Sequence, residues 1–211
     1  MKGRRFRSSF VLICLACLVS IAFAFRSIED REKSDKDRTI SDFRLLTTDG
    51  NIVSLSDYKD AKGFIIVFTS NHCPFAKLYT SRLNDLYSRY SPLDVPLLAI
   101  NSMDSVVYEE ENFEMMKQKS ISASFKFPYL WDRRQTVGKD FGATHTPHAF
   151  VIWKENNQWI IEYSGAIDDN GAEPNIVRHA YVDEALKELL SGQHVTLAET
   201  HSIGCAIYYR R

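Results

Sequence analysis

The spacing of apolar residues along the chain predicts strands and helices in alternation. The stretches "GFIIVF" (63–68) and "PLLAI" (96–100) are unbroken apolar runs, typical of strands buried on both faces of a sheet. Between them, residues 74–90 carry apolar side chains at helical spacing, and Pro74 fits a first helical turn because its missing N–H is not needed there. We therefore expect a helix between two buried strands.

The same pattern extends over the rest of the chain. Two short apolar runs flank Asp49-Gly50, a dipeptide that favours a hairpin turn. Further on, the pattern predicts a helix over 105–119, a strand over 127–132, a short helix over 134–142, a strand hairpin over 148–167 and a closing helix over 175–192. This order predicts an α/β domain with a central mixed sheet and helices on both faces.

A separate apolar segment lies at the start of the chain. Four basic residues precede it (Lys2, Arg4, Arg5, Arg7), and Ala22-Phe23-Ala24 supplies the small side chains that a signal peptidase requires. The run 8–25 is also as long as the shortest membrane-spanning helix, so a signal peptide and an uncleaved anchor both stay open. We expect residues 1–25 to be one of these, 26–38 a charged linker, 39–192 the folded domain and 193–211 a tail.

Composition narrows the choice of function. The 211 residues, 45% of them apolar, suffice for one well-filled core, and a net charge of -1 gives no basic footprint for nucleic acid. Cys14 and Cys17 lie within the apolar segment, where small apolar filler is the simpler interpretation. Cys73 and Cys205 are left, and two thiols in one exported domain are candidates for a structural or a catalytic disulfide.

Cys73 lies at the junction between the first buried strand and the helix that follows it. Chemistry in open sheets gathers beyond the carboxyl ends of parallel strands. A thiol is nucleophilic only as thiolate, and the N–H groups and macrodipole of a helix N-terminus favour that anion. Such junctions are exposed, and His72 and Lys77 add positive charge nearby. We therefore expect a reactive Cys73 whose pKa lies below that of a free thiol.

The stretch "DGNIVSLSDYKDAKGFIIVFTSNHCPFAK" resembles the thioredoxin-like superfamily, and within it the redoxin branch of alkyl hydroperoxide reductases and thiol-specific antioxidants. The nearest resemblance is to a peroxiredoxin-like group with an "NHCP" motif, here residues 71–74, and a "GC" pair near the C-terminus, here Gly204-Cys205. The resemblance implies a thioredoxin-like three-layer sandwich, with Cys73 as the attacking cysteine and Pro74 beside it.

The same resemblance assigns Thr146-Pro147 in "GATHTPHAF" to the proline that thioredoxins hold in cis beside the active thiol. The Thr146 backbone would then pair with an extended substrate, so that Thr146, Pro147 and Pro74 form the implied substrate-binding set.

Three positions depart from the wider family. Ala76 stands where a thioredoxin has its second cysteine, and Val67 replaces the buried acid that helps thioredoxins move protons. His72, Lys77 or water would have to take that role. Ser70 stands where typical peroxiredoxins have a threonine, which puts peroxidase activity in doubt. Cys205 is the candidate resolving cysteine, although a static disulfide or a free tail thiol fits the spacing equally well.

These observations favour an exported or membrane-tethered thiol-disulfide oxidoreductase, a peroxiredoxin-like antioxidant protein of the periplasm or the extracellular space. Its partners would be a protein or small-molecule disulfide or oxidant and an external thiol reductant, and no cofactor is required. The alternative is a non-catalytic thioredoxin-fold binding module, which would hold peptides in the proline groove or copper through Cys73 and His72, His145 and His148.

Overall fold

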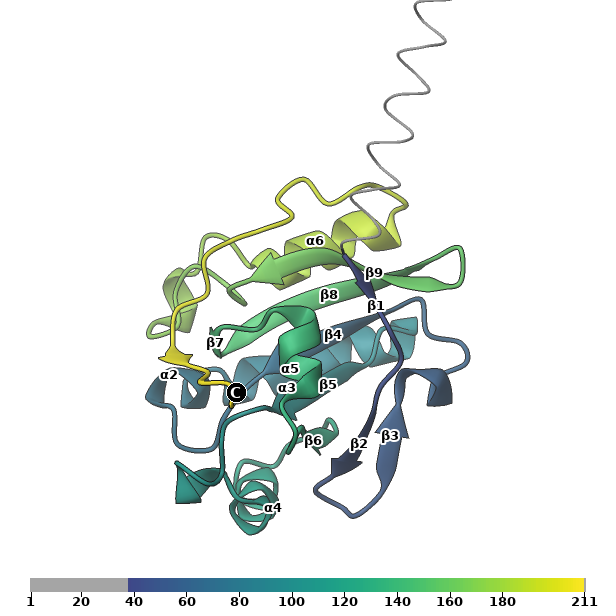
Figure 1. The fold of residues 1–211 in the computed structure, drawn as a ribbon. Helices are drawn as coiled ribbons and strands as arrows, with labels where there is room; N and C mark the ends of the chain where they lie inside the picture. The colour runs from purple at the N-terminus through teal and green to yellow at the C-terminus, as the bar shows by residue number, and fades with distance from the viewer. Residues whose placement is uncertain (1–37, 211) are drawn as a thin grey trace, which may run out of the picture. The chain divides into compact units, whose positions relative to one another are not determined.

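The structure, a computed structural model, describes residues 38–210 (Figure 1). The chain divides into two units, residues 1–39 and 40–211. The signal peptide or anchor expected at 1–25, and nearly all of the expected linker, lie outside the described residues. None of the helices between residues 38 and 210 is both long and apolar enough to cross a membrane.

The elements follow the predicted alternation. The strands are β1 (Thr39–Ile40), β2 (Arg44–Thr47), β3 (Ile52–Ser54), β4 (Gly63–Phe68), β5 (Leu97–Asn101), β6 (Tyr129–Trp131), β7 (His145–Thr146), β8 (His148–Glu155), β9 (Gln158–Gly165) and β10 (Cys205–Ala206). The α-helices are α2 (Pro74–Lys77), α3 (Thr80–Tyr90), α4 (Phe113–Ser122), α5 (Thr136–Phe141) and α6 (Tyr181–Leu190). The short 3-10 helices are η1 (Leu55–Asp57), η2 (Ser91–Leu93), η3 (Glu109–Glu111) and η4 (Pro174–Ile176).

Within residues 38–210, eight strands form one mixed sheet in the order β1-β9-β8-β4-β5-β6-β2-β3, and β10 pairs with β7 in a separate ribbon. β4, β5 and β6 run parallel, so their carboxyl ends meet at one edge. β8 runs antiparallel to β4, with Phe150 opposite Ile66 and His148 opposite Phe68. The predicted mixed sheet is confirmed, and Cys73 lies five residues beyond the end of its central strand.

Alternate residues of β4 point to opposite faces of the sheet, and each face has its own apolar cluster. Ile65 and Val67 pack in the cluster that includes the buried faces of α3 and α6. Phe68 packs in the cluster that includes α5, with ring centroids 5.4 Å from Phe141 and 5.6 Å from Phe150. Because a fully buried side chain of this size contributes ~1.5–3 kcal/mol, these clusters fix the sheet that carries the site.

Three helices are shorter than the sequence pattern predicts. The helix expected over 74–90 is divided, because Leu78 and Tyr79 donate to Phe75 and Ala76 in tight three-residue turns between α2 and α3. The helix expected from residue 105 begins at 113, where the Asn112 side chain caps it by accepting from the Met115 N–H. The closing helix begins at 181 rather than 175.

Both predicted hairpins form. Asn156 and Asn157, with φ of 49° and 62°, make the turn between β8 and β9 in the left-handed conformation that such turns require. Gly50, with φ of 92°, turns the chain between β2 and β3. The tail, for which the sequence showed no pattern, runs down one side of the domain, forms β10 beside β7 and α2, and ends near α5 (yellow in Figure 1).

Candidate redox site

Cys73 forms the cap of α2 and is fully buried. The expectation of an exposed thiol is therefore wrong. The expected helix macrodipole is also small, because α2 spans only Pro74–Lys77. The environment of the sulfur must instead be traced to individual hydrogen-bond partners.

The first partner is the segment that precedes β8. The Thr146-Pro147 peptide bond is cis, and the Cys73 thiol donates to the Thr146 carbonyl oxygen at 3.0 Å. Ser70 links the same two segments, because its hydroxyl accepts from the Cys73 N–H at 3.2 Å and lies 3.2 Å from the Thr146 hydroxyl. The attacking cysteine and the cis-proline segment that the resemblance pairs are thus in contact, although they lie far apart in sequence.

The second partner is Cys205 in the tail. β10 pairs antiparallel with β7, which places Cys205 opposite Thr146. Both cysteines are free rather than joined in a disulfide. A residue that the sequence left without an assigned element is therefore held opposite the residue whose carbonyl oxygen accepts from the Cys73 thiol.

The electrostatic influence of each thiol on the other helps to shift their pKa values in opposite directions. Burial raises the pKa of Cys73, but donors from the Cys205 thiol, the Ala76 backbone and the Thr146 side chain outweigh it and lower that pKa below its usual value. Burial and the neighbouring Cys73 raise the pKa of Cys205 to about 12. The pair therefore holds one proton on Cys205 and develops its negative charge on Cys73.

Glu111 is the buried acid that sequence analysis missed. Its fully buried carboxylate accepts from the N–H groups of Asn71 at 2.9 Å and His72 at 3.2 Å, and from the Asn101 side chain at 2.6 Å. Because two of these donors immediately precede Cys73, Glu111 fixes the backbone that carries the thiol. Its sequence signal was the acidic run 109–111, which was interpreted as the start of a helix.

The other predicted site residues, His72, Lys77 and Pro74, make no hydrogen bond to the Cys73 sulfur within residues 38–210. The His72 imidazole turns its Nδ1 to Glu111 and stacks on Tyr108 with ring centroids 5.3 Å apart. The exposed Lys77 donates its backbone N–H to the Cys73 carbonyl at 3.1 Å. Pro74 opens α2 at the first helical position.

The histidines proposed for copper do not gather around the cysteine. In the described part of the chain, no three histidine, cysteine, aspartate or glutamate side chains are arranged to hold a metal ion. His148 accepts from the Thr144 N–H at 3.2 Å and lies 3.1 Å from the Ser164 hydroxyl. Burial, with smaller contributions from His145 and His201, lowers the pKa of His148 to about 4.

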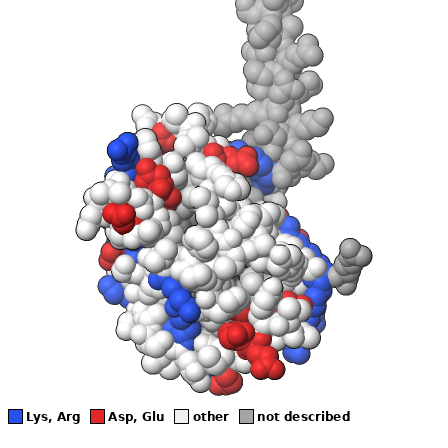
Figure 2. Space-filling view, turned by 90° about the vertical axis from the view of Figure 1, so that its left-hand side faces the viewer, with Lys and Arg blue, Asp and Glu red and all other residues white. Residues whose placement is uncertain are grey.

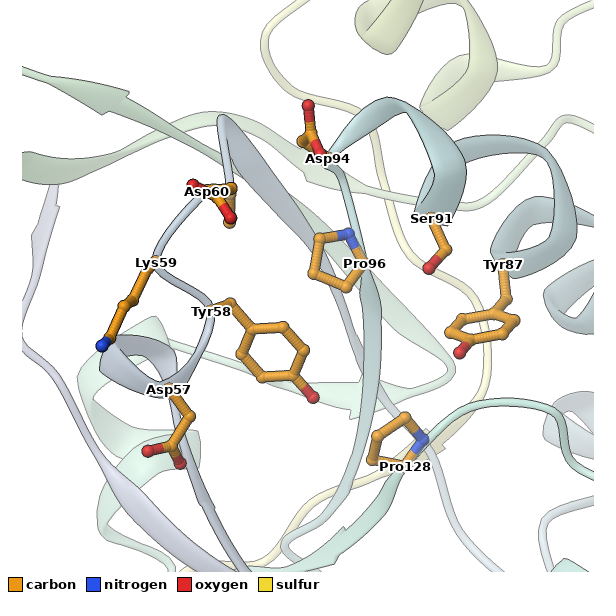
Figure 3. Close-up of a pocket in the computed structure, with 10 residues that line it drawn as sticks. Asp57, Tyr58, Lys59, Asp60, Tyr87, Ser91, Asp94, Pro96 and Pro128 are labelled. Carbon is orange, nitrogen blue, oxygen red and sulfur yellow. The ribbon is translucent and has the colours of Figure 1, made fainter.

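A pocket of about 360 Å³ lies at the other end of the sheet (Figure 3). Its lining includes Ala61, Pro96 and Pro128, which precede β4, β5 and β6 respectively. It therefore opens at the amino ends of the parallel strands, opposite the edge that carries Cys73. Neither cysteine nor histidine lines it, so it belongs to a different part of the molecule from the thiol pair.

A known protein family matches more than half of this chain. Residues 37–167 match the AhpC/TSA family. The chain belongs to that family. The expectation of a thiol-dependent oxidoreductase of the redoxin branch is thereby confirmed at the level of the family. A comparison with curated protein sequences gave no match.

Several solved structures share the fold of this chain. A hypothetical protein from Sinorhizobium meliloti is 31% identical with a TM-score of 0.74, over 82% of this chain and 93% of that one. An uncharacterized conserved protein from Geobacillus kaustophilus is 34% identical with a TM-score of 0.74, over 82% and 90%. The peroxidoxin BcpB from Mycobacterium tuberculosis, 18% identical with a TM-score of 0.53 over 73% and 94%, shares the fold. The thioredoxin-like sandwich is confirmed.

Proposed function

We propose that this member of the AhpC/TSA family is an exported or membrane-tethered thiol oxidoreductase in which Cys73 attacks and Cys205 resolves. The observation that carries the proposal is the antiparallel pairing of β10 with β7, which sets Cys205 opposite Thr146, the residue whose carbonyl oxygen accepts from the Cys73 thiol at 3.0 Å. Neighbouring thiols with opposed pKa shifts are suited to separate roles, one as the nucleophile and the other as the proton-bearing partner.

The proposed reaction starts at the Cys73 thiolate. It attacks one sulfur of a substrate disulfide, forms a mixed disulfide and expels the other sulfur as a thiolate. Cys205 then loses its proton and attacks the Cys73 sulfur, which releases the second substrate thiolate and leaves a Cys73–Cys205 disulfide. An external dithiol reduces that bond and is itself oxidised. With a hydroperoxide in place of the disulfide, the Cys73 thiolate attacks one peroxide oxygen, the O–O bond breaks, and the other oxygen takes up a proton and leaves as water or an alcohol. Cys205 then attacks the sulfur of the resulting Cys73 sulfenic acid, whose hydroxyl leaves as water with the proton from Cys205, and a Cys73–Cys205 disulfide remains.

His72 and Glu111 have different parts in this proposal. Glu111 is a positioning residue, because its bonds end on the loop before Cys73. The imidazole of His72 is partly exposed beside the site and held through Nδ1, which leaves its other ring nitrogen for proton exchange with solvent or substrate. Lys77 adds charge to the rim of the site from the end of α2.

A test of the cysteine roles follows intermediates by mass spectrometry after a small disulfide is added to the reduced protein. The wild type should end with Cys73 joined to Cys205, and the Cys205→Ser variant should stop with the small thiol attached to Cys73. Peptide mapping separates these products from reactions of Cys14 and Cys17. Full turnover by the Cys73→Ser variant would falsify the mechanism.

The proposed location rests on the basic residues and the apolar run 8–25. Cell fractionation and the N-terminal mass of the mature chain test it. A chain that begins after Ala24 outside the cytoplasm indicates a removed signal peptide, and a full-length chain extracted only with membranes indicates an anchor. A full-length chain free in the cytoplasm contradicts both.

A further inference from the structure

The backbone of Thr146, with which an extended substrate would pair, is already paired with the C-terminal tail. Residues 199–210, called the strap here, place Cys205 opposite Thr146 in an antiparallel pair. The approach at Gly204 is so close that an added Cβ would lie 2.1 Å from the Thr146 carbonyl oxygen, a backbone atom with little freedom to move. Only glycine fits there, so the strap is seated on the cis-proline segment rather than merely near it.

Upstream of Cys205, the strap is fixed to the end of β9. Thr200 donates its N–H to the Ser164 carbonyl oxygen and accepts the Ala166 N–H on its side chain, both at 3.0 Å. The Tyr163 hydroxyl lies 2.5 Å from the Thr200 hydroxyl. The strap therefore cannot swing away at this end without breaking several bonds.

Downstream of Cys205, the strap is fixed to the segment around α5. Ile207 donates its N–H to the Thr144 carbonyl oxygen at 2.8 Å, and the Tyr209 hydroxyl donates to Ala143 at 2.6 Å. The Gln135 side chain donates to the Tyr208 carbonyl oxygen at 3.0 Å and accepts from the Arg210 N–H at 2.9 Å. With both ends held, the part over Cys73 opens only locally.

We propose that the strap excludes extended polypeptides from the Thr146 edge and so restricts Cys73 to disulfides of low molecular weight. This inference rests on the proposed function, since it concerns the substrate of the same thiol. An extended polypeptide gains affinity from main-chain bonds to a free edge, and here Cys205 makes those bonds. A small disulfide needs only a brief local separation of Gly204 and Cys205 from Thr146.

Charge offers no competing explanation for selectivity on this side of the molecule. Figure 2 shows the side on which the strap and α2 lie in Figure 1, with charged side chains scattered around a largely uncharged centre. Such a surface neither attracts nor repels a peptide strongly. The obstacle to a polypeptide is therefore the strap itself.

The test compares two probes with the same leaving group. One is the mixed disulfide of nitrothiobenzoate with N-acetylcysteine amide, and the other is the same mixed disulfide on the central cysteine of an extended neutral peptide. Attack by the Cys73 thiolate joins its sulfur to the cysteine sulfur of the probe and expels the coloured thiolate, so one absorbance follows both reactions. The reduced full-length protein should react with the small probe at least about tenfold faster, a ratio equivalent to losing one or two hydrogen bonds.

Two variants loosen the strap from different positions. Gly204→Ala forces the strap off the Thr146 carbonyl, and Gln135→Ala removes three of its downstream bonds. Each should raise the ratio of the peptide rate to the small-probe rate, by roughly tenfold for Gly204→Ala if the close contact is lost. Ile203→Ala, which truncates an exposed side chain of the same strap, is the matched control and should leave the ratio unchanged.

The outcomes separate this inference from the proposed function. Equal rates with both probes in the wild type, or no rise of the ratio in either folded variant, overturn the exclusion by the strap while Cys73 chemistry stands. If neither probe reacts, or if the Cys73→Ser variant releases the coloured thiolate as fast as the wild type, the proposed function fails and the inference falls with it.

Discussion

Both cysteines of the site lie against Thr146, yet the regions that hold them are built differently. Cys73 is fully buried, and the N–H groups of the two residues before it are bound to a buried carboxylate. Cys205 lies half-buried in a two-residue strand, held mainly through backbone bonds. Two identical side chains can therefore differ in chemistry because their surroundings differ. The fixed environment of Cys73 lowers its pKa, and the position of Cys205 beside the charge on Cys73 raises the pKa of Cys205.

The largest effect on stability is expected at the buried carboxylate that binds the residues before Cys73. Glu111→Ala leaves the donors of Asn71, His72 and Asn101 buried without an acceptor, and should lower the free energy of unfolding by about 3 kcal/mol or more. Denaturant unfolding measures the loss. Glu110→Ala, which truncates the exposed neighbouring acid and keeps its backbone carbonyl, is the control. If both variants unfold alike, the carboxylate is not what holds the Cys73 loop.

The free energy of unfolding should decrease in acid because of His148, which lies between the two cysteines in the sequence. Its folded pKa of about 4 lies below the ordinary 6.5, so the unfolded chain binds the proton more tightly. The stabilisation from neutral His148 is complete above about pH 6.5 and is lost as the pH falls towards 4, by roughly 3 kcal/mol in total. Unfolding at a series of pH values should show a flatter slope in His148→Asn, whereas the exposed-residue control His194→Asn should keep the wild-type slope.

A smaller effect is expected in the strap that carries Cys205. Gln135→Ala removes three bonds to the strap and should cost about 1–2 kcal/mol in local opening. Amide hydrogen exchange at Cys205 and Ile207 should then accelerate, while exchange in β4 and β5 stays as in the wild type. Equal acceleration in the central strands would mean that the strap and the sheet open as one unit.

The smallest effect sharpens the electrostatic part of the comparison. Cys205→Ala removes the thiol that donates to Cys73, so the pKa of Cys73 should rise. At neutral pH this leaves less thiolate, and alkylation of Cys73 should slow a few-fold once the rate is corrected for accessibility by comparing plateau rates at high pH. A Cys73 titration that does not move in Cys205→Ala would show that the tail thiol has no part in stabilising the anion.

The local features of the fold could be predicted because they depend on neighbouring residues. The apolar run 63–68, the helical spacing after Pro74 and the Asn156-Asn157 turn each carry their signal within a few positions. The position of Cys73 beyond the central strand follows from the same pattern, because a buried strand must end before a polar junction begins.

What could not be predicted depends on contacts between distant segments. The burial of Cys73 follows from a strap whose only strand has two residues, too short for any periodicity. The role of Glu111 depends on a contact with Asn71 across some forty positions, and an acidic run on its own is typical of an exposed helix start. The sequence pattern shows which residues are apolar, but it does not show which buried acceptor will pair with which donor.

The close contact of Gly204 with Thr146 has a consequence for the order in which the parts of the chain fold during synthesis. The strap follows every strand of the main sheet along the chain, so during synthesis the Cys73 pocket can form before its cover has emerged. A nascent molecule therefore passes through a stage with a competent, uncovered thiol, open to any passing thiol or disulfide. The pairing of Cys205 with Thr146 ends that stage.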